Sequence, residues 1–593
     1  MKSHLCAILF LLSSAFAQEP RSISGIYPSL ATFNNEGECG TGAVVPWADR
    51  LWVISYGPHL PYGSSDKLYE ITPDLQQIIR PESVGGTPAN RMIHRESNQL
   101  IIGPYFIDAQ RNVRVVPPQK MPGRLTGAAR HLSDPANKIY LGTMEAGLYE
   151  VDVHSLAVTG LLKDRMNKPK PGQTSEERPA TIETKLPGWH GKGLFSGQGR
   201  VVFSNNGEHG KAVEQNPDSV SGALGEWMGS GDFQLVRRSQ FLEVTGPGGI
   251  YGNDHPETDP VWATGWDKRS LLVLCLDGGK WHTFRLPKPS HTYDGAHGWN
   301  TEWPRIRDIG EGDLLMTLHG GLWRFPKTFC AQNSGGIAPR STHLCVTGDF
   351  CRWKDRIVFG CDVTAQKEFF NKLKAKGKVL APGQSQSNLW FVKPQTLDEL
   401  GVPIGSGAVW LGDKVIAQTP SDPILFTGFT HRSLWLEHGE AQPVTFTLEV
   451  DAKGNGQWAK LREVEVAARS TQNVLFKSDE SGAWLRVSAN HDCATATALL
   501  HYRNEDTRSA VASSIFDGVA KPTDTDVSGG LLRARGDNKR TLGFATADAY
   551  YELDGALNLT RRDDKKAEDY LRNGMAIPQG VLGADAASML YTD

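Results

Sequence analysis

Short apolar runs separated by Gly, Asp, Asn and Pro turns recur along most of the chain, and helical periodicity is nearly absent. The clearest amphipathic helix candidate is the short segment AQKEFFNKLKAKG at 365–377. Apolar runs of similar character are RLWVISY (50–56), QLIIGPYFI (99–107), KIYLGTM (138–144), RVVFSNN (200–206), SLLVLCL (270–276), DLLMTLH (313–319) and RIVFGCD (356–362). Runs of this length between turn residues are typical of buried β-strands. The pattern predicts an all-β protein.

Several of these runs are followed by a second strand that combines leucine with an aromatic residue. The instances are KLYEIT (67–72), GLYEVDV (147–153), GLWRFP (321–326) and NLWFVKP (388–394). The central strands recur roughly every 40–50 residues, the spacing of β-propeller blades. We expect a seven- or eight-bladed β-propeller, with the eighth blade beginning at GSGAVWLGDKVIAQT (405–419). An array of β-sandwiches is the alternative, but it does not explain the repeated pairing of central and aromatic strands.

The pattern changes to simple alternation after residue 423, where QPVTFTLEVDAKGNGQWAKLREVEV contains a hairpin turn. Alternation of this kind predicts a small antiparallel β-sandwich. The expected domains are therefore a propeller over residues 18–423 and a sandwich over 424–502. Segments GGLLRARGDNKRTLGFAT and AYYELDG within 529–555 resemble blade strands again. We therefore expect residues 503–593 to return to the final blade and end in a charged tail.

Residues 1–17 have a short basic start, an apolar run and small residues ending in Ala15-Phe16-Ala17. This is the pattern of a cleaved signal peptide, so we expect a secreted or periplasmic protein. Seven cysteines remain after it, an odd number, so at least one thiol stays unpaired. Among Cys330, Cys345, Cys351 and Cys361, local disulfides or buried thiols are favoured over zinc, because the spacing lacks close ligand pairs.

Charge and composition narrow the class of partner. The net charge is −3 at pH 7 and the pI is about 6.6, so there is no overall electrostatic attraction for nucleic acid or an anionic membrane. No segment after the signal approaches the roughly 20 apolar residues of a membrane helix. We expect a protein without a membrane span that binds neither nucleic acid nor lipid.

Propellers collect binding residues at one end of the central channel, and the segments that enter the inner strands are unusually rich in His, Arg and Trp. The catalytic candidates there are His94, His190, Tyr251 and His255. A histidine or tyrosine can act as a general base. For His94, which precedes a turn and a central strand, the alternative is a structural role that ties neighbouring strands together.

Cationic and aromatic side chains from different repeats form the expected substrate-binding set. Its members are Arg91, Arg130, Lys192, Trp189, His297, Trp303, Arg305 and Arg352. Arginine pairs with carboxylate or sulfate through two parallel hydrogen bonds, and tryptophan can stack on a sugar ring. Three of these residues lie in the run SHTYDGAHGWNTEWPRIRD (290–308), which is expected to lead into an inner strand at 304–309. The alternative is that the arginines join blades through backbone carbonyls and aspartates.

No organic cofactor is expected, because the chain lacks a phosphate-binding loop, a nucleophile elbow and a zinc-binding helix motif. The loop YGNDHPETDP (251–260) offers Asp254, Glu257 and Asp259, oxygen ligands of the kind that calcium prefers. Calcium is therefore the one metal considered.

The blade pattern, the signal and the His, Arg and Trp loops resemble secreted seven-bladed propeller enzymes that act on uronate polysaccharides, the ulvan lyases and rhamnose-glucuronate lyases. The resemblance covers roughly residues 40–420 and rests on architecture, with no family motif matched residue by residue. It implies β-elimination, in which His or Tyr removes the C5 proton while basic or amide side chains neutralise the carboxylate. The alternatives are a glycoside hydrolase using paired carboxylates from among Glu302, Asp308, Glu208 and Asp254, and a non-catalytic propeller that binds a glycan or a protein.

Overall fold

The computed structural model divides into two compact units, residues 1–372 with 383–507 and residues 373–382 with 508–593. In the first unit it describes residues 30–33, 40–56, 62–87, 91–165, 180–208, 213, 216, 219–290, 304–343, 346–361 and 386–506. In the second it describes residues 531–534, 541–546, 549–554, 558–574, 583–584 and 589–590. The signal predicted over residues 1–17 lies outside these ranges.

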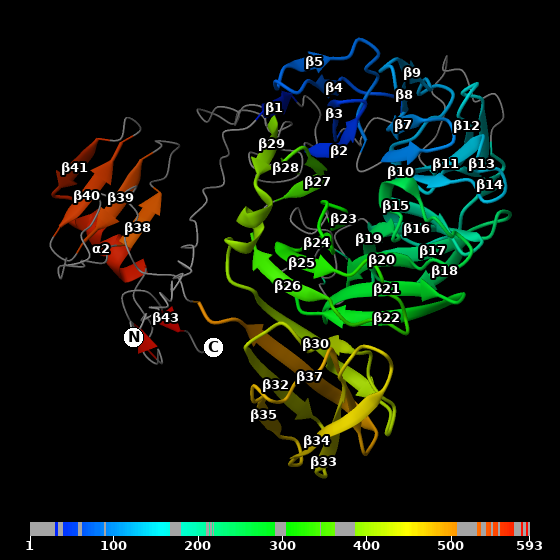
Figure 1. Cartoon of the computed structure of the whole chain (residues 1–593). Coiled ribbons are helices and arrows are strands. Elements are labelled where there is room, and N and C mark those ends of the chain that lie inside the picture. Colours follow the sequence, from blue (N-terminus) through cyan, green and yellow to red (C-terminus); the bar gives the residue numbers. More distant parts are fainter. Residues whose placement is uncertain are drawn as a thin grey trace, which may run out of the picture. The chain divides into compact units, whose positions relative to one another are not determined.

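Seven sheets follow one another in the described part of the first unit (Figure 1). The first three are β2 (Thr41–Trp47), β3 (Arg50–Ser55), β4 (Leu68–Ile71) and β5 (Gln77–Ile79); β6 (Arg91–His94), β7 (Gln99–Ile102), β8 (Tyr105–Asp108) and β9 (Val113–Val115); and β10 (Leu125–Arg130), β11 (Lys138–Thr143), β12 (Leu148–Asp152), β13 (Val158–Lys163) and β14 (Ile182–Glu183). The fourth and fifth are β15 (Trp189–Gly197), β16 (Arg200–Gly207), β17 (Ala223–Trp227) and β18 (Gln234–Arg237); and β19 (Gln240–Thr245), β20 (Val261–Trp266), β21 (Leu271–Asp277) and β22 (Lys280–Leu286). The last two are β23 (Arg305–Arg307), β24 (Leu314–Leu318), β25 (Gly321–Phe325) and β26 (Ala338–Thr342); and β27 (Thr347–Trp353), β28 (Arg356–Cys361) and β29 (Gln386–Val392), joined by β1 (Leu30–Phe33).

These sheets stack face to face into a closed ring, the arrangement of a β-propeller. One apolar cluster fills each space between consecutive sheets. A further cluster joins Val44 and Val53 of the first sheet to Val358 and Leu389 of the seventh. Because each sheet is covered on both faces, its central strands read as continuous apolar runs without alternation. The propeller predicted from the repeats is confirmed.

Strand β1 completes the seventh sheet by pairing antiparallel with β29, Leu30 opposite Leu389. A strand from the N-terminal region therefore closes the ring.

The sequence predicts that residues 503–593 return to the final blade, but the strands described in this segment belong to another sheet. Strands β38 (Leu531–Ala534), β39 (Leu542–Ala545), β40 (Tyr550–Leu553) and β41 (Leu559–Arg562) form a sheet of their own in the second unit, with α2 (Lys565–Gly574) and the pair β42 (Gly583–Ala584) and β43 (Met589–Leu590). Short Leu and aromatic strands suit any antiparallel sheet, which is why the sequence pattern misassigned them.

The second sheet-rich part of the first unit is an antiparallel sandwich. One of its sheets contains β30 (Ile404–Val415), β37 (Cys493–Arg503), β32 (His431–His438) and β35 (Thr471–Leu475). The other contains β31 (Ile424–Leu425), β36 (Trp484–Ala489), β33 (Val444–Asp451) and β34 (Trp458–Val466). The segment predicted to begin an eighth blade is thus β30 of the sandwich, because its apolar run suits either kind of sheet.

The sandwich is joined to the propeller by a shared sheet, since β31 pairs in parallel with β22 of the fifth blade. Arg285 on β22 is fully buried, and its guanidinium binds Asp267 at 2.9 Å and Asp422 at 3.0 Å. The indole nitrogen of Trp484 donates to the backbone oxygen of Ser334 at 3.2 Å. The domain boundary predicted at residue 424 thus marks the change from the propeller fold to the sandwich fold, but one sheet continues across it.

The described cysteines Cys275, Cys330, Cys351 and Cys493 are thiols outside disulfides, whereas Cys39 and Cys345 lie outside the described residues. Three of these four, Cys275, Cys351 and Cys493, are buried, in agreement with the buried-thiol alternative. None of the helices in the described ranges is long and apolar enough to cross a membrane.

Candidate functional site

A cavity of about 280 Å³ lies on the axis of the propeller, and each of the seven innermost strands (β2, β6, β10, β15, β19, β23 and β27) contributes to its lining. Six of these strands contribute residues from their middle or later parts, such as Val44–Pro46 of β2, whereas β6 contributes its first three residues, Arg91–Ile93. The cavity therefore lies toward the end at which the inner strands finish. From the sequence, the site was expected at the opposite end of the channel, where the preceding segments enter the inner strands.

A loop from the fifth blade crosses this end of the channel. It runs through residues 246–252 and contains the 3-10 turn η1 (Gly249–Tyr251), which packs against β6 of the second blade. Ile250 joins the apolar cluster between the first two blades. Gly252 has φ +75°, and a Cβ there would lie 2.2 Å from Cδ of Arg130. The loop thus needs glycine where it passes the third blade.

Arg95 holds this loop on the second blade, and Arg130 lies beside Gly252. The guanidinium carbon of Arg95 lies 4.7 Å from the ring centroid of Tyr251, and Arg95 also pairs with Asp254. Arg130 pairs with Glu96. Tyr251 keeps 39% of its surface exposed, so it faces the cavity while solvent can still reach it.

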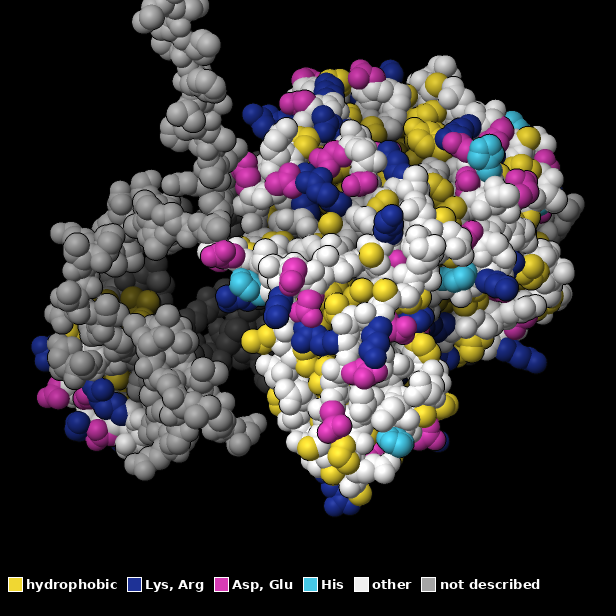
Figure 2. Space-filling view, turned by 60° about the horizontal axis from the view of Figure 1, so that its bottom comes forward, with side chains coloured by type: hydrophobic (Ala, Val, Ile, Leu, Met, Phe, Trp, Pro, Cys, Tyr) yellow, Lys and Arg dark blue, Asp and Glu magenta, His cyan; other side chains and the backbone are white. Residues whose placement is uncertain are grey.

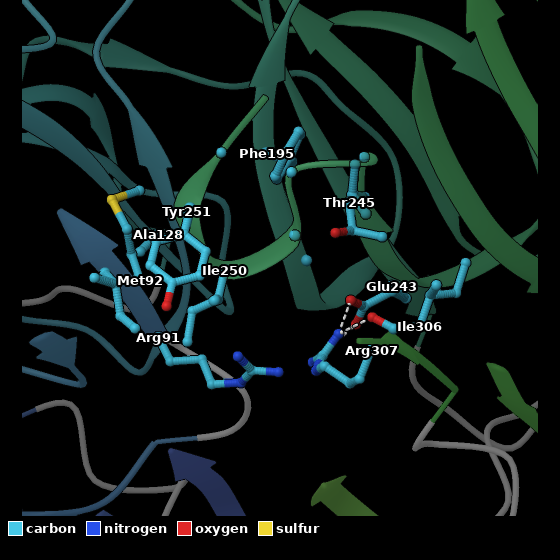
Figure 3. A pocket seen from close by; sticks show the side chains of 18 of the residues that line it. Arg91, Met92, Ala128, Phe195, Glu243, Thr245, Ile250, Tyr251, Ile306 and Arg307 are labelled. Carbon is cyan, nitrogen blue, oxygen red and sulfur yellow. Dashed lines mark hydrogen bonds and ion pairs between the residues drawn. The ribbon is translucent and has the colours of Figure 1, made fainter. Parts of the chain in front are cut away.

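The floor of the cavity carries a network of buried charges. Nε of Arg91 lies 2.6 Å from Oδ2 of Asp349, and Nε of Arg307 lies 2.8 Å from Oδ1 of the same carboxylate. Nη1 of Arg307 also contacts Glu243. Figure 3 shows Arg91 and Arg307 extending into the same space, with Glu243 beside Arg307. Arg305 lies beneath them, with its Nη1 3.5 Å from Oε2 of Glu243.

Lys192 extends the network from β15. Its Nζ donates to the hydroxyl of Tyr56 at 2.8 Å, and both residues are buried. Among the residues that the structure describes, the cluster of Arg91, Lys192, Arg305 and Arg307 contacts or surrounds two carboxyl groups, those of Glu243 and Asp349. Within the described ranges, four cations are thus gathered around two carboxyl groups.

Burial controls the proton affinity of the carboxyl groups. It raises the pKa of Glu243 from 4.5 to about 8, because an ionised carboxylate loses its hydration there, while Arg305 and Arg91 act in the opposite direction. Burial raises the pKa of Asp349 as well, again against Arg91 and Arg305. Protonation of Glu243 at neutral pH adds to the excess positive charge. An anion in the cavity would offset it.

The outer surface contrasts with this cavity. Figure 2 shows basic and acidic side chains interspersed on the visible face of the first unit. The whole chain carries a net charge of −3. Attraction for an anion is therefore a local property of the channel.

Five predicted site residues line the cavity: Arg91, Arg130, Lys192, Tyr251 and Arg352. Arg352 lines the cavity and donates from Nε to the backbone oxygen of Lys354 at 2.7 Å. The structure thus brings together a tyrosine and several cations from different blades, as a shared site requires.

The remaining predicted residues of the propeller lie elsewhere. His94 is fully buried, with Nδ1 2.7 Å from Oγ of Ser97 and Nε2 2.7 Å from the backbone oxygen of Pro135. These contacts tie two blades together, which is the structural alternative for this residue. His190 is the second residue of β15, is 5% exposed and has φ +60°. Neither histidine is among the residues that line the cavity.

Trp189 packs with its ring 5.3 Å from the guanidinium carbon of Arg165, away from the cavity lining. His255 is exposed, and its backbone nitrogen donates to Oδ2 of Asp259 at 2.9 Å. Arg305 was expected to face an anionic substrate group, but its side chain is only 1% exposed and lies below the lining. His297 and Trp303 lie outside the described residues.

The loop proposed for calcium does not gather its carboxylates. Asp254 pairs with Arg95, and Asp259 caps the turn at His255. Within the described ranges, no three His, Cys, Asp or Glu side chains are grouped to hold a metal ion. Asp254 is therefore an ion-pair residue and Asp259 a turn residue in this loop.

Sequence reasoning missed Glu243 and Asp349, the acidic partners of the cluster. Each is the single acidic residue of a largely buried inner strand, QFLEVT for Glu243 and TGDFCRW for Asp349. A lone carboxylate in a buried strand requires a buried cation or hydrogen-bond donors. A lone carboxylate in each of these strands was therefore the sequence signal that could have indicated a buried cation or donor nearby.

Comparisons with known proteins add little to what the strand pairing shows about the fold. No family model and no curated protein sequence matches this chain. An exo-beta-1,3-galactanase from Phanerochaete chrysosporium is similar over 62% of this chain and 93% of its own, at 9% identity and a TM-score of 0.22. YCF48 from Cyanidioschyzon merolae is similar over 68% of this chain and 94% of its own, at 10% identity and a TM-score of 0.26. Scores this low carry no argument about function.

Proposed function

We propose that this protein acts on an acidic saccharide, and that a carboxylate of the saccharide binds in the central cavity of the propeller. The observation that supports the proposal is the convergence of cationic side chains from separate blades at this cavity, where they outnumber the carboxyl groups among the described residues. Arginine offers paired hydrogen bonds to a carboxylate. The cavity of about 280 Å³ is at the lower end of the usual range for ligand sites, so it suits one charged sugar unit.

The reaction that this arrangement supports best is β-elimination at a uronate. Cations that hold the carboxylate stabilise the negative charge that develops when the neighbouring C5 proton is removed. Tyr251 is the candidate base, because it lines the same cavity as Arg91 and retains solvent access. In its ionised form, the Tyr251 hydroxyl oxygen takes the C5 proton, the electron pair of the C5–H bond forms the C4–C5 double bond, and the bond from C4 to the departing sugar oxygen breaks. The departing oxygen takes up a proton, from Tyr251 or from water.

A hydrolase is the second candidate, favoured by the raised pKa of Glu243. A carboxyl group that stays protonated at neutral pH can donate a proton to a departing sugar oxygen. The carboxylates considered from the sequence offer less support, since Glu208 pairs with Arg238 and Asp254 with Arg95, while Asp308 pairs with Lys327. Glu302 lies outside the described residues.

A panel of uronate-containing and neutral polysaccharides separates these candidates. Unsaturated uronate absorbance together with new reducing ends identifies a lyase. New reducing ends alone identify a hydrolase. Binding of acidic but not neutral glycans without either product identifies a binding protein, and equal binding of both classes contradicts the proposed carboxylate recognition.

Replacement of Arg352 with glutamine is expected to weaken binding of the acidic glycan about tenfold, because one charge-assisted contact is lost at the edge of the cavity. Isothermal titration of the purified variant measures this. Arg324→Gln is the matched control, since Arg324 is 40% exposed on the sixth blade and pairs with Asp398. Unchanged affinity in Arg352→Gln, or equal losses in both variants, contradicts the assignment.

Binding of an acidic saccharide is expected to weaken as pH rises through about 8, where Glu243 ionises. Below that pH the neutral carboxyl group does not compete with the ligand for Arg307, whereas above it a negative charge does. The affinity is expected to fall about tenfold between about pH 7 and about pH 9, which corresponds to a change of about one unit in the pKa of Glu243 when the ligand binds. Titrations across this range measure it.

Glu243→Gln keeps the neutral form at every pH, so its affinity is expected to remain high and flat across the same range. Asp308→Asn is the control, because Asp308 also borders the cavity but has a 56% exposed side chain. A wild-type affinity independent of pH, or a Glu243→Gln variant with the wild-type profile, would show that Glu243 does not control the charge of the site.

A further inference from the structure

A second cavity, of about 180 Å³, lies between the fourth and fifth blades. Its walls come from residues 219–221, 237–240 and 266–269. None of these residues lines the central cavity. Strand β19 begins at Gln240 beside the second cavity and ends at Thr245 in the central one. The two cavities therefore lie at opposite ends of the same inner strand.

Four basic side chains line this second cavity, from two turns that are adjacent in space. Arg237 ends β18 and Arg238 follows it before β19, while Lys268 and Arg269 lie between β20 and β21. The side chains of the three arginines are 26–29% exposed. They are therefore within reach of a ligand from solvent and also partly removed from water.

The nearby carboxylates are already engaged. Both oxygens of Asp267 accept from Arg285, at 3.0 and 2.9 Å. Glu208 accepts from Arg238 and from the backbone nitrogen of Gly222. Asp413 binds Arg269 at 2.8 Å and accepts from the backbone nitrogen of Leu411. Asp267, Glu208 and Asp413, the described carboxylates named here, thus already have cations and donors as partners.

Arg237 is left with weak compensation. Among the described residues, its shortest contact to a carboxylate is 3.6 Å, to Asp267, and its hydrogen bonds go to the neutral hydroxyls of Thr283 and Ser239. Burial, followed by repulsion from Arg285, lowers the pKa of this guanidinium. Nη1 of Arg238 is buried without a hydrogen-bond partner among the described residues. Both observations indicate guanidinium groups that an anion would stabilise.

We propose that this second cavity binds an oxyanion, such as the carboxylate or sulfate substituent of an anionic saccharide, with Arg237 as its principal contact. Arg238, Lys268 and Arg269 surround the same space and add positive charge. The planar fork of Arg237 suits two oxygens of one acidic group. This site does not depend on chemistry in the central cavity.

The test uses the full chain and inorganic sulfate as the first probe. Sulfate is titrated calorimetrically at constant ionic strength, with chloride as the reference salt. We expect sulfate to bind the wild-type protein and Arg237→Gln to bind it about tenfold more weakly, from the loss of a charge-assisted contact. Arg356→Gln is the matched control, because Arg356 is 42% exposed on the seventh blade and pairs with Asp355.

Two outcomes overturn the proposal: sulfate binding that does not exceed chloride binding, and wild-type sulfate affinity in Arg237→Gln. If circular dichroism shows that Arg237→Gln does not fold, Lys268→Gln replaces it with the same criteria. Glucuronate and neutral glucose form the second arm. Arg237-dependent glucuronate binding supports a saccharide carboxylate as the occupant, and Arg237-dependent binding of sulfate alone supports a sulfate group.

Failure of this site is distinguishable from failure at the centre of the propeller. Arg352→Gln changes the central cavity and leaves the second cavity intact. Sulfate affinity that depends on Arg237 but not on Arg352 assigns the anion to the second cavity. Dependence on Arg352 alone contradicts the proposal and places the anion in the channel.

Discussion

Replacement of Arg305 with methionine is expected to lower the free energy of unfolding of the first unit by about 3–5 kcal/mol, the usual cost of removing one partner from a buried ionic network. The side chain is only 1% exposed. Its Nε donates to the backbone oxygen of Gly348 at 2.9 Å, and its Nη1 donates to that of Pro304 at 2.7 Å. Methionine fills much of the space but satisfies neither carbonyl.

The loss of charge adds to the loss of hydrogen bonds. Arg305 favours the ionised forms of both Glu243 and Asp349, so its removal leaves these buried carboxyl groups with fewer cations. Urea denaturation followed by tryptophan fluorescence measures the effect. The control is Arg356→Met on the surface, for which we expect a change within about 0.5 kcal/mol.

A variant Arg305→Met with wild-type stability and lost glycan binding would contradict this prediction. It would restore the role that the sequence indicated for Arg305, contact with an anionic group of the substrate. The two roles could not be separated from the sequence, because both place an arginine at the start of an inner strand. Burial separates them, since a side chain below the cavity lining cannot contact the ligand.

The repeated strand pattern was sufficient to predict the propeller, because stacking of sheets on both faces imposes continuous apolar runs. The expected inner strand at 304–309 is present as β23. Ring closure was not predictable, since the pairing of Leu30 with Leu389 joins segments that share no local signal. The role of β30 was missed for a related reason: its apolar run is compatible with a blade or a sandwich.

Part of the candidate site was also predictable. Cations on successive inner strands converge because these strands surround one axis, and Arg91, Arg130 and Lys192 accordingly line one cavity. The end of the channel at which they meet was not predictable, because it depends on how the loop of residues 246–252 crosses between blades. His94, by contrast, was a catalytic candidate, but its ring nitrogens contact a turn serine and a backbone carbonyl of the next blade.

Replacement of Tyr251 with phenylalanine is expected to reduce elimination by about 10²–10⁴-fold, the usual contribution of a general base. The substitution removes one oxygen from a ring that is 39% exposed and keeps the ring that stacks with Arg95. We therefore expect glycan affinity and the melting temperature to remain close to those of the wild type. A change in turnover without a change in binding indicates a contact made in the transition state.

The measurement is the initial rate of unsaturated uronate formation on the best acidic polysaccharide, together with a binding isotherm for each variant. Tyr570→Phe is the matched control, because Tyr570 is a 59% exposed tyrosine in the second unit. Wild-type turnover in Tyr251→Phe would exclude this hydroxyl as the base. Failure of the wild-type protein to form unsaturated product from any uronate glycan that it binds would contradict elimination itself. The excess cations of the channel would then support recognition of the carboxylate without cleavage, since the charges that stabilise a developing negative charge also hold a carboxylate in its ground state.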